Sequence, residues 1–233
     1  PLPISSVGGT INIVTKSTEL TKGGKVGATV GSDGYLKSVL NYNTGIMDGG
    51  HALSFVFSRT AGDGVVDFTE FEAFSYFLGY GWKSEDDKNN IQFIVTGAPQ
   101  YHQQRYYSYY NQGTLQQYID HGIYYNYTGG MYDGQGFNMR RNFYHKPIAS
   151  VNWESKLNTK STLSVTAYAS VGRGGGTGDL GRITTGGAGS FGHYFSGDLN
   201  YGSQPGRYAL RNPDTGYFDF DKLAANNSGQ PVT

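Results

Sequence analysis

The stretch EAFSYFLGYGWK, from Glu72 to Lys83, alternates bulky side chains with mostly small ones. Because successive side chains of a β-strand point to opposite faces, one face of this stretch is large and mainly aromatic. The opposite face is mostly Gly, Ala and Ser. In a water-soluble protein, a sheet usually has its large apolar side chains on the face toward the core and its charged side chains on the face toward water. The small face here suits a crowded or polar lumen better than open water.

Six further segments alternate in the same way along the chain. They cover residues 25–30, 36–46, 52–58, 91–98, 147–154 and 162–171. The sequence therefore predicts an all-β fold with seven strands. With their flanks, these strands reach the roughly 9 to 11 residues that a tilted strand needs to cross a bilayer.

The predicted connections fall into a short set and a long set. Residues 48–50, 83–89 and 157–161 make short links after every second strand. The alternate links grow from GSDG at residues 31–34 to about ten residues at 61–71 and about 48 at 100–147, and the region after Val171 is longer still. A soluble sandwich has no reason to sort its connections by length, and structureless loops this long argue against a compact soluble domain. Short turns on one side and long loops on the other are typical of an outer-membrane β-barrel.

The composition excludes several classes of protein but identifies no binding partner. The 233 residues include 36 Gly and 20 Tyr, with 37% hydrophobic and 15% charged residues, which is unlike a helical or a highly charged disordered chain. Basic and acidic residues number 18 each, so no overall field attracts nucleic acid. The absence of Cys excludes disulfides, thiolate metal sites and Cys nucleophiles. No apolar run is long enough for a membrane helix, a test that does not detect barrel strands.

The opening GGTINIVTK of residues 8–16 carries a recognisable motif. It combines a double Gly, Ile-Asn-Ile and Thr-Lys, at Gly8, Gly9, Ile11, Asn12, Ile13, Thr15 and Lys16. This motif resembles the one that closes the N-terminal plug domain of TonB-dependent outer-membrane receptors. Later segments are similar to early barrel strands of that family, particularly of the branch with a carboxypeptidase-regulatory-like domain before the plug: EAFSYFLGYGW, IQFIVTGAPQYHQQR, MRRNFYHKPIASVNWE and ASVGRGGGTG.

The resemblance implies that this chain is a fragment of a 22-stranded antiparallel transmembrane β-barrel. Residues 1–16 correspond to the C-terminal end of the plug domain, 17–24 to a linker, and 25–233 to about seven barrel strands with periplasmic turns and extracellular loops. An open sheet edge in lipid leaves backbone groups unpaired, so the remaining strands are expected beyond Thr233. Most of the plug, any energy-coupling box and the signal peptide are expected before Pro1.

The resemblance also implies a function in the bacterial outer membrane. Such a receptor takes up a scarce solute (a siderophore, vitamin, oligosaccharide or peptide), driven by a TonB-type inner-membrane complex, with no catalysed reaction and no cofactor. Its implied partners are the energy-coupling protein, the lipid bilayer and lipopolysaccharide, with a surface lipoprotein or larger outer-membrane complex as a further candidate; nucleic acid is not expected. Two alternatives stay open. A structural or assembly-associated barrel would have a vestigial plug without an energy-coupling box, and a barrel enzyme would need a catalytic dyad or triad near the rim.

The long segment of residues 100–147 holds 11 of the 20 Tyr and supplies the candidate ligand contacts. These are Tyr106, Tyr107, Tyr109, Tyr110, Tyr124, Tyr125, Arg140 and Arg141. Tyr joins a flat apolar face to a polar tip, which suits sugars, peptides or chelates, and Arg suits an anionic ligand or lipopolysaccharide phosphates. Other interpretations stay open: the rings belong to an interfacial girdle or pack the loop, and the arginines form ion pairs within it.

Three further motifs predict no chemistry. GTGDLG at residues 176–181 matches the dinucleotide fingerprint, but the Gly-rich sequence after it cannot open the required helix, so a loop is predicted. The acidic residues Asp63, Asp67, Glu70 and Glu72 are close enough in sequence to bind Ca²⁺, but they lack the spacing of a calcium loop, and solvated loop charge is favoured. The five His lack zinc-site spacing, and no G-x-S-x-G is present. No catalytic residue and no metal site are predicted.

Overall fold

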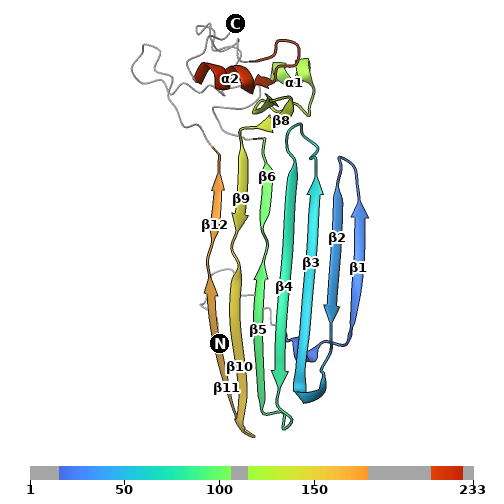
Figure 1. Cartoon of the computed structure of the whole chain (residues 1–233), viewed down its shortest axis with the longest axis vertical. Coiled ribbons are helices and arrows are strands. Elements are labelled where there is room, and N and C mark those ends of the chain that lie inside the picture. Colours follow the sequence, from blue (N-terminus) through green and yellow to red (C-terminus); the bar gives the residue numbers. More distant parts are fainter. Residues whose placement is uncertain (1–15, 106–114, 178–210, 228–233) are drawn as a thin grey trace, which may run out of the picture.

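One antiparallel sheet forms most of the molecule. The computed structural model describes residues 16–105, 115–177 and 211–227. The strands of its main sheet lie side by side in the order β1-β2-β3-β4-β5-β10-β11 (Figure 1). The fold is all-β, as predicted, and the sheet is open, with β1 and β11 as the edges of this path.

All seven predicted strands are present, although the one predicted at 36–46 ends at Asn43, the one predicted at 52–58 reaches Gly62, and three resume after a short interruption. The strands of the large sheet are β1 (Gly23–Val30), β2 (Leu36–Asn43), β3 (His51–Gly62), β4 (Phe71–Lys83), β5 (Asn89–Gly97), β6 (Gln100–Gln103), β9 (Arg141–His145), β10 (Ile148–Asn158), β11 (Ser161–Ser170) and β12 (Arg173–Gly176). In Figure 1, β6 prolongs β5, β9 runs into β10, and β12 prolongs β11. Two of the three interruptions contain Pro99 and Pro147, which cannot donate a backbone hydrogen bond to the sheet.

The prediction of a connection of about 48 residues at 100–147 is wrong in extent and in character. Strands β6 and β9 pair with each other, Tyr101 opposite Phe143, and leave only residues 104–140 between them. This connection contains helix α1 (Leu115–His121) and the hairpin of β7 (Gly129–Tyr132) and β8 (Gln135–Asn138). Such short elements lack the sustained alternation that identified the longer strands.

The predicted separation of short and long connections to opposite ends of the sheet is confirmed by the structure. The short turns that follow β2, β4 and β10 lie together at one end of the sheet, called here the turn end (Figure 1). The first turn includes the short helix η2 (Asp48–Gly50). The connections of residues 31–35, 63–70 and 104–140 lie at the opposite end, called the loop end.

The register separates the sheet into an apolar face and a polar face. Cross-strand pairing aligns Leu53 with Tyr80, Tyr80 with Phe93, and Phe93 with Val151 in one row. The apolar face comprises this row and its alternate neighbours along the strands, including Val26, Leu40, Phe55, Phe57, Phe74, Tyr76, Leu78, Trp82, Ile91, Val95, Trp153, Leu163 and Val165. Many of these side chains are exposed: Leu53 is 46% exposed and Phe93 is 44% exposed.

The polar face carries mostly small and hydrogen-bonding side chains, with Val39, Val56, Phe77 and Ile94 as apolar exceptions. It includes Ser54, Ser58, Ser75, Gly79, Gly81, Gln92, Thr96, Asn152 and Thr166. Ser54 and Gln92 on this face are buried, at 4% and 3% exposure, whereas many large side chains of the apolar face are exposed to solvent. This distribution inverts the usual one of a water-soluble sheet, and single exposed hydrophobic residues do not account for so continuous an apolar surface.

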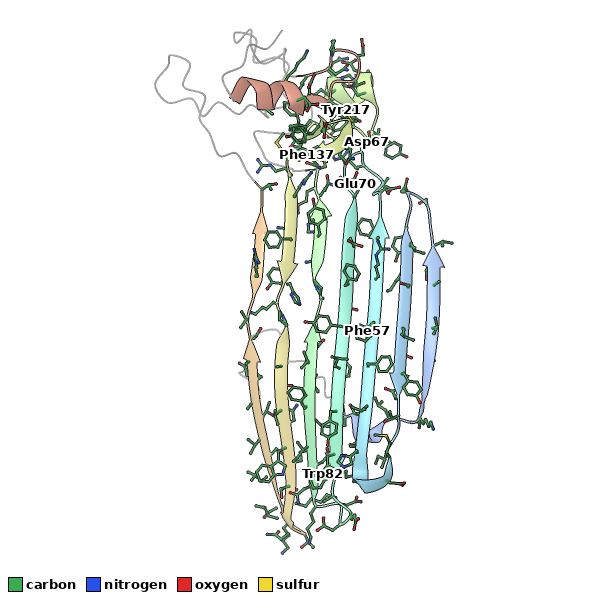
Figure 2. All side chains as sticks on the ribbon, viewed as in Figure 1. Phe57, Asp67, Glu70, Trp82, Phe137 and Tyr217 are labelled. Atoms are coloured by element: carbon green, nitrogen blue, oxygen red, sulfur yellow. The ribbon has the colours of Figure 1, made fainter. Side chains whose placement is uncertain are left out.

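A small cap lies at the loop end. Strand β13 (Phe218–Asp219) pairs in parallel with β7, and helix α2 (Phe220–Asn227) follows it. Buried Met139, Phe218 and Phe220 pack with Phe137 to form the core of this cap. Figure 2 shows Asp67, Phe137 and Tyr217 gathered there, far from Trp82 at the turn end. No helix in the described ranges is long and apolar enough to cross a membrane.

Candidate functional site

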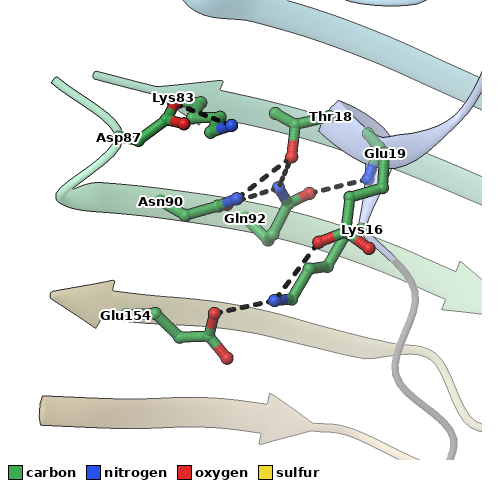
Figure 3. Close-up of polar contacts among 9 residues, drawn as sticks. Lys16, Thr18, Glu19, Lys83, Asp87, Asn90, Gln92 and Glu154 are labelled. Carbon is green, nitrogen blue, oxygen red and sulfur yellow. Dashed lines mark hydrogen bonds and ion pairs between the residues drawn. The ribbon is translucent and has the colours of Figure 1, made fainter. Parts of the chain in front are cut away.

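The segment of residues 16–19 lies against the polar face near the turn end (Figure 3). Its last three residues form the short helix η1 (Ser17–Glu19), which contacts β3 and β4. Lys16 Nζ lies 2.7 Å from Glu154 Oε2 on β10 and 3.4 Å from Glu19 Oε1. The hydrogen bond to Glu154 raises the pKa of Lys16 and outweighs the opposing effect of burial. The ammonium group is therefore a stable charged anchor between this segment and the sheet.

Gln92 fixes the same segment through its side-chain amide. Gln92 Oε1 accepts a hydrogen bond from the backbone N–H of Ser17 at 3.0 Å, and Gln92 Nε2 donates to Thr18 Oγ1 at 3.1 Å. Asn90 Nδ2 donates to the same Thr18 oxygen at 3.1 Å, and Asn90 Oδ1 accepts from Gln92 at 2.8 Å (Figure 3). Each amide is thus used as both donor and acceptor, as burial requires.

Two glycines of β4 provide the floor under η1. A Cβ atom added at Gly79 would lie 2.5 Å from Ser17 Oγ, and one added at Gly81 would lie 2.8 Å from Thr18 Cγ2. Ser17 and Thr18 are only 1% and 5% exposed as a result of this close approach. The small face of the EAFSYFLGYGWK stretch is therefore the surface on which this segment rests.

This arrangement holds a chain segment against the sheet by three kinds of contact. One end is held by an ion pair, the middle by amide hydrogen bonds, and the underside by contact with glycine backbone. Of the predicted plug motif, only Lys16 lies within the described residues. Gly8, Gly9, Ile11, Asn12, Ile13 and Thr15 lie outside them.

The cap at the loop end is organised around Arg211, which the sequence did not single out. Its guanidinium donates to Tyr125 Oη at 3.1 Å, to the carbonyl of Gly216 at 2.7 Å and to the carbonyl of Tyr127 at 2.9 Å. The guanidinium carbon also lies 3.8 Å from the centre of the Phe218 ring. Burial lowers the pKa of Arg211, a group that nevertheless stays charged at neutral pH. Arg211 joins the 104–140 connection to the segment of residues 211–227.

Tyr217 makes a second link within the cap. Its hydroxyl donates to a carboxylate oxygen of Asp67, and its ring stacks on Tyr125 with centroids 5.0 Å apart. Burial, followed by the bond to Asp67, raises the pKa of Tyr217 above its ordinary value. The loop of residues 63–70 is thereby tied to the same cap.

The candidate ligand contacts are separated by the structure into different environments. Tyr106, Tyr107, Tyr109 and Tyr110 lie outside the described residues. Tyr124 is 52% exposed, whereas Tyr125 is 1% exposed with its hydroxyl donated to the carbonyl of Gly216. Of this pair, only the ring of Tyr124 faces solvent.

The two candidate arginines belong to the base of the same connection. Arg141 Nε donates to the carbonyl of Asn138 at 3.0 Å, and its guanidinium lies 4.0 Å from the centre of the Phe137 ring. The backbone N–H of Arg140 donates to Asn138 Oδ1 at 2.8 Å. Asn138 itself is fully buried and uses its amide to hold the carbonyls of Phe68 and Gln104. Sequence reasoning missed Asn138, which has no motif around it.

Two of the four acidic residues of the 63–72 region bind separate partners, and Glu70 Oε2 is buried without a hydrogen-bond partner among the described residues. Asp67 accepts from Tyr217, and Glu72 pairs with Arg59 at 2.7 Å. Within the described ranges, no three His, Asp or Glu side chains are close enough together to hold a metal ion. Of the GTGDLG motif, Gly176 ends strand β12, and residues 178–181 lie outside the description.

Comparisons with known proteins leave the family open. No protein-family model, no curated protein and no solved structure matches this chain. The resemblance to TonB-dependent receptors stays a prediction from the residues of the sequence.

Proposed function

We propose that this chain forms part of the wall of a TonB-dependent outer-membrane transporter. In this proposal the apolar face of the sheet contacts lipid, the polar face lines the lumen, and residues 17–24 connect a plug domain, which ends at residue 16, to the barrel. The loops capture a scarce solute, and a TonB-type protein pulls on the plug to admit it. Transport of this kind needs no catalytic residue and no cofactor.

The observation that carries the proposal is the inverted sheet with residues 16–19 held on its polar face. Lipid-facing and lumen-facing residues alternate in membrane barrels, with bulk and apolarity on the outside. Leu53, Phe93 and Val151 are exposed in one row, while Gln92 on the other face is buried against η1. A segment such as Ser17–Glu19, which directly follows the plug-like motif and lies on the polar face, fits the start of a plug-to-barrel linker.

The ends of the strands support the same orientation. The indole of Trp82 donates to the carbonyl of Gly49 at 3.2 Å, and that of Trp153 donates to Asn89 Oδ1 at 3.2 Å. Both rings are on the apolar face at the turn end, and their polar edges reach the turns (Figure 2 labels Trp82). Trp side chains are enriched at membrane–water interfaces, where one part of the ring is apolar and the other is hydrated.

The open edges of the sheet match a wall that needs further strands. β1 is exposed along its whole length, and β11 likewise. An exposed edge cannot stay unpaired in a bilayer, so in the proposed barrel both edges pair with further strands. The 22-strand count comes from the family resemblance.

Membrane orientation can be tested with single cysteines, because the native chain has none. Phe93→Cys and Val151→Cys place a thiol on the apolar face, and Thr96→Cys and Asn152→Cys place one on the polar face. In the full-length protein in outer-membrane vesicles, a membrane-soluble maleimide should label the first pair and a charged maleimide only the second. Equal labelling of both pairs by the charged reagent contradicts the membrane assignment.

Transport is tested separately by native mass spectrometry of the full-length protein purified from its own membrane. A chelate, glycan or peptide released by mild collisional activation supports uptake and names the solute class. A tightly held protein partner without any small molecule contradicts uptake and favours the assembly-associated barrel.

A further inference from the structure

We propose that a hollow between the first two connections of the loop end binds an organic ammonium group. The hollow has a volume of about 260 Å³ and lies between residues 31–35 and 64–71. Two aromatic rings form its apolar part, and two Asp side chains carry the charge beside it. As a site for the transported solute it rests on the proposed function, whereas the binding of an ammonium group depends only on these two connections.

The rings of Tyr35 and Phe71 lie together on the polar face. Phe71 pairs with Gly62, one position from the pair of Ala61 and Glu72 on the apolar face. A Cβ atom added at Gly62 would lie 2.9 Å from the Phe71 ring and 3.4 Å from Tyr35 Cα, so both residues lie against this glycine. The two ring centroids are 6.4 Å apart, and the ring planes are inclined by 45°. Both side chains are only half-buried, which leaves ring surface open to a cation, and the face of an aromatic ring attracts one.

The turn between β1 and β2 fixes Asp33 at the hollow. Asp33 and Gly34 have φ angles of 54° and 66°, and the N–H of Tyr35 donates to the carbonyl of Ser32 at 3.0 Å. These are the features of a type I′ turn, which strongly favours Asp-Gly or Asn-Gly. Asp33 lines the hollow in this conformation. Its position is therefore set by the hairpin before any ligand binds.

Asp63 brings a second carboxylate to the same turn. Its backbone N–H donates to the carbonyl of Asp33 at 2.8 Å, and a Cβ atom added at Gly34 would collide with Asp63 Oδ2. Neither Asp33 nor Asp63 forms an ion pair with any residue that the structure describes. Two carboxylates held on one turn repel each other, and a cation beside them removes that repulsion.

The charge around the hollow selects the kind of ligand. The connections of residues 31–35 and 63–70 contain four acidic residues and no Lys, Arg or His. The nearest basic residue along β2 is Lys37, two positions beyond Tyr35. A metal ion would need more oxygen ligands than two carboxylates supply, and no group of three His, Asp or Glu is present in the described part of the chain. Aromatic walls beside carboxylates without ion-pair partners therefore fit an organic ammonium group.

The test measures the binding of choline to the full-length protein in detergent by ligand-observed NMR titration at low salt. The uncharged analogue 3,3-dimethylbutan-1-ol has the same shape and is the comparison probe. The wild type should bind choline more tightly than the analogue. Asp33→Asn keeps a favourable type I′ turn, and this variant, Asp63→Asn and Phe71→Leu should each weaken choline binding about two- to fivefold, the size expected for one exposed charge or cation–π contact.

Asp48→Asn is the matched control, because Asp48 also precedes a Gly in a turn but lies at the turn end. It removes the same charge and should leave choline binding unchanged. Equal binding of choline and its analogue by the wild type, no binding of choline, or the same loss in D48N as in D33N and D63N would overturn the ammonium site. Failure of the cysteine-labelling experiment would instead overturn the membrane proposal and leave choline binding intact, so the two failures are distinguishable.

Discussion

Lys16 and Glu154 are 138 positions apart in the chain and meet on the polar face with 2.7 Å between Nζ and Oε2. One belongs to the segment before the first strand, and the other to β10. Because they come from opposite ends of the described sheet sequence, this pair reports directly whether residues 16–19 are held against the sheet.

Removal of the ion pair should loosen the segment without unfolding the sheet. The side chains of Lys16 and Glu154 are 24% and 44% exposed, so solvent screens much of their attraction. We expect a coupling energy of about 0.5 kcal/mol between Lys16→Met and Glu154→Gln in a double-mutant cycle of full-length protein unfolded by urea. Lys83→Met is the control, since Lys83 pairs with Asp87 in a turn and does not touch residues 16–19. A coupling energy of zero would mean that the pair contributes nothing.

Alkaline pH should release the same segment. The pKa of Lys16 is raised above 10.5 in the folded protein, so its stabilising contribution is complete below pH 10.5 and is lost as the pH rises through the raised value. A spin label on Leu20→Cys should stay immobile at neutral pH and gain mobility above pH 10.5. In the Glu154→Gln background the label should already be more mobile at pH 7, and the alkaline step should be smaller. An alkaline step of the same size in both proteins contradicts a role for this ion pair.

Added methyl groups on β4 should displace η1. Gly79→Ala and Gly81→Ala place a Cβ within 2.5 and 2.7 Å of existing side-chain atoms, and overpacking of this kind costs about 1 to 3 kcal/mol. Hydrogen exchange of the Ser17 amide, which donates to Gln92, should accelerate in both variants. Gly27→Ala on the polar face of β1 is the matched control, because nothing lies within 4 Å of the added carbon. Equal exchange rates in all three variants would show that η1 does not rest on these glycines.

The cap should depend on Arg211 and the sheet should not. Arg211→Met leaves the carbonyls of Gly216 and Tyr127 without their charged donor, at an expected cost of about 2 to 4 kcal/mol to the local stability of the cap. Amide exchange in β7 and β13 should rise strongly, while exchange in β3 and β4 stays unchanged. Arg105→Met is the comparison, since Arg105 makes one exposed bond to the carbonyl of Ile123 and should have a small effect. Uniform loss of protection across the sheet would contradict a separate cap.

The sequence predicted the strands because their evidence is local. Alternation along EAFSYFLGYGWK and six similar runs placed every main strand and both faces, and the side chains of Leu78 and Gly79 are on the predicted sides. The predictions stopped short at residues 100–103, 141–145 and 173–176, where strands resume after an interruption. In a strand of four or five residues, alternation of apolar and polar side chains cannot be distinguished from a chance arrangement.

The sequence by itself determined which segments are strands and which face of each is apolar, since both depend on a pattern within about ten residues. Only the tertiary structure decided which residues from distant parts of the chain lie side by side. The ion pair of Lys16 with Glu154 and the clamp of Arg211 on Tyr125 both require the register of intervening strands and the packing of long connections. A shift of one residue in any register would turn those side chains to the other face, and nothing in the local pattern fixes the sum of six registers.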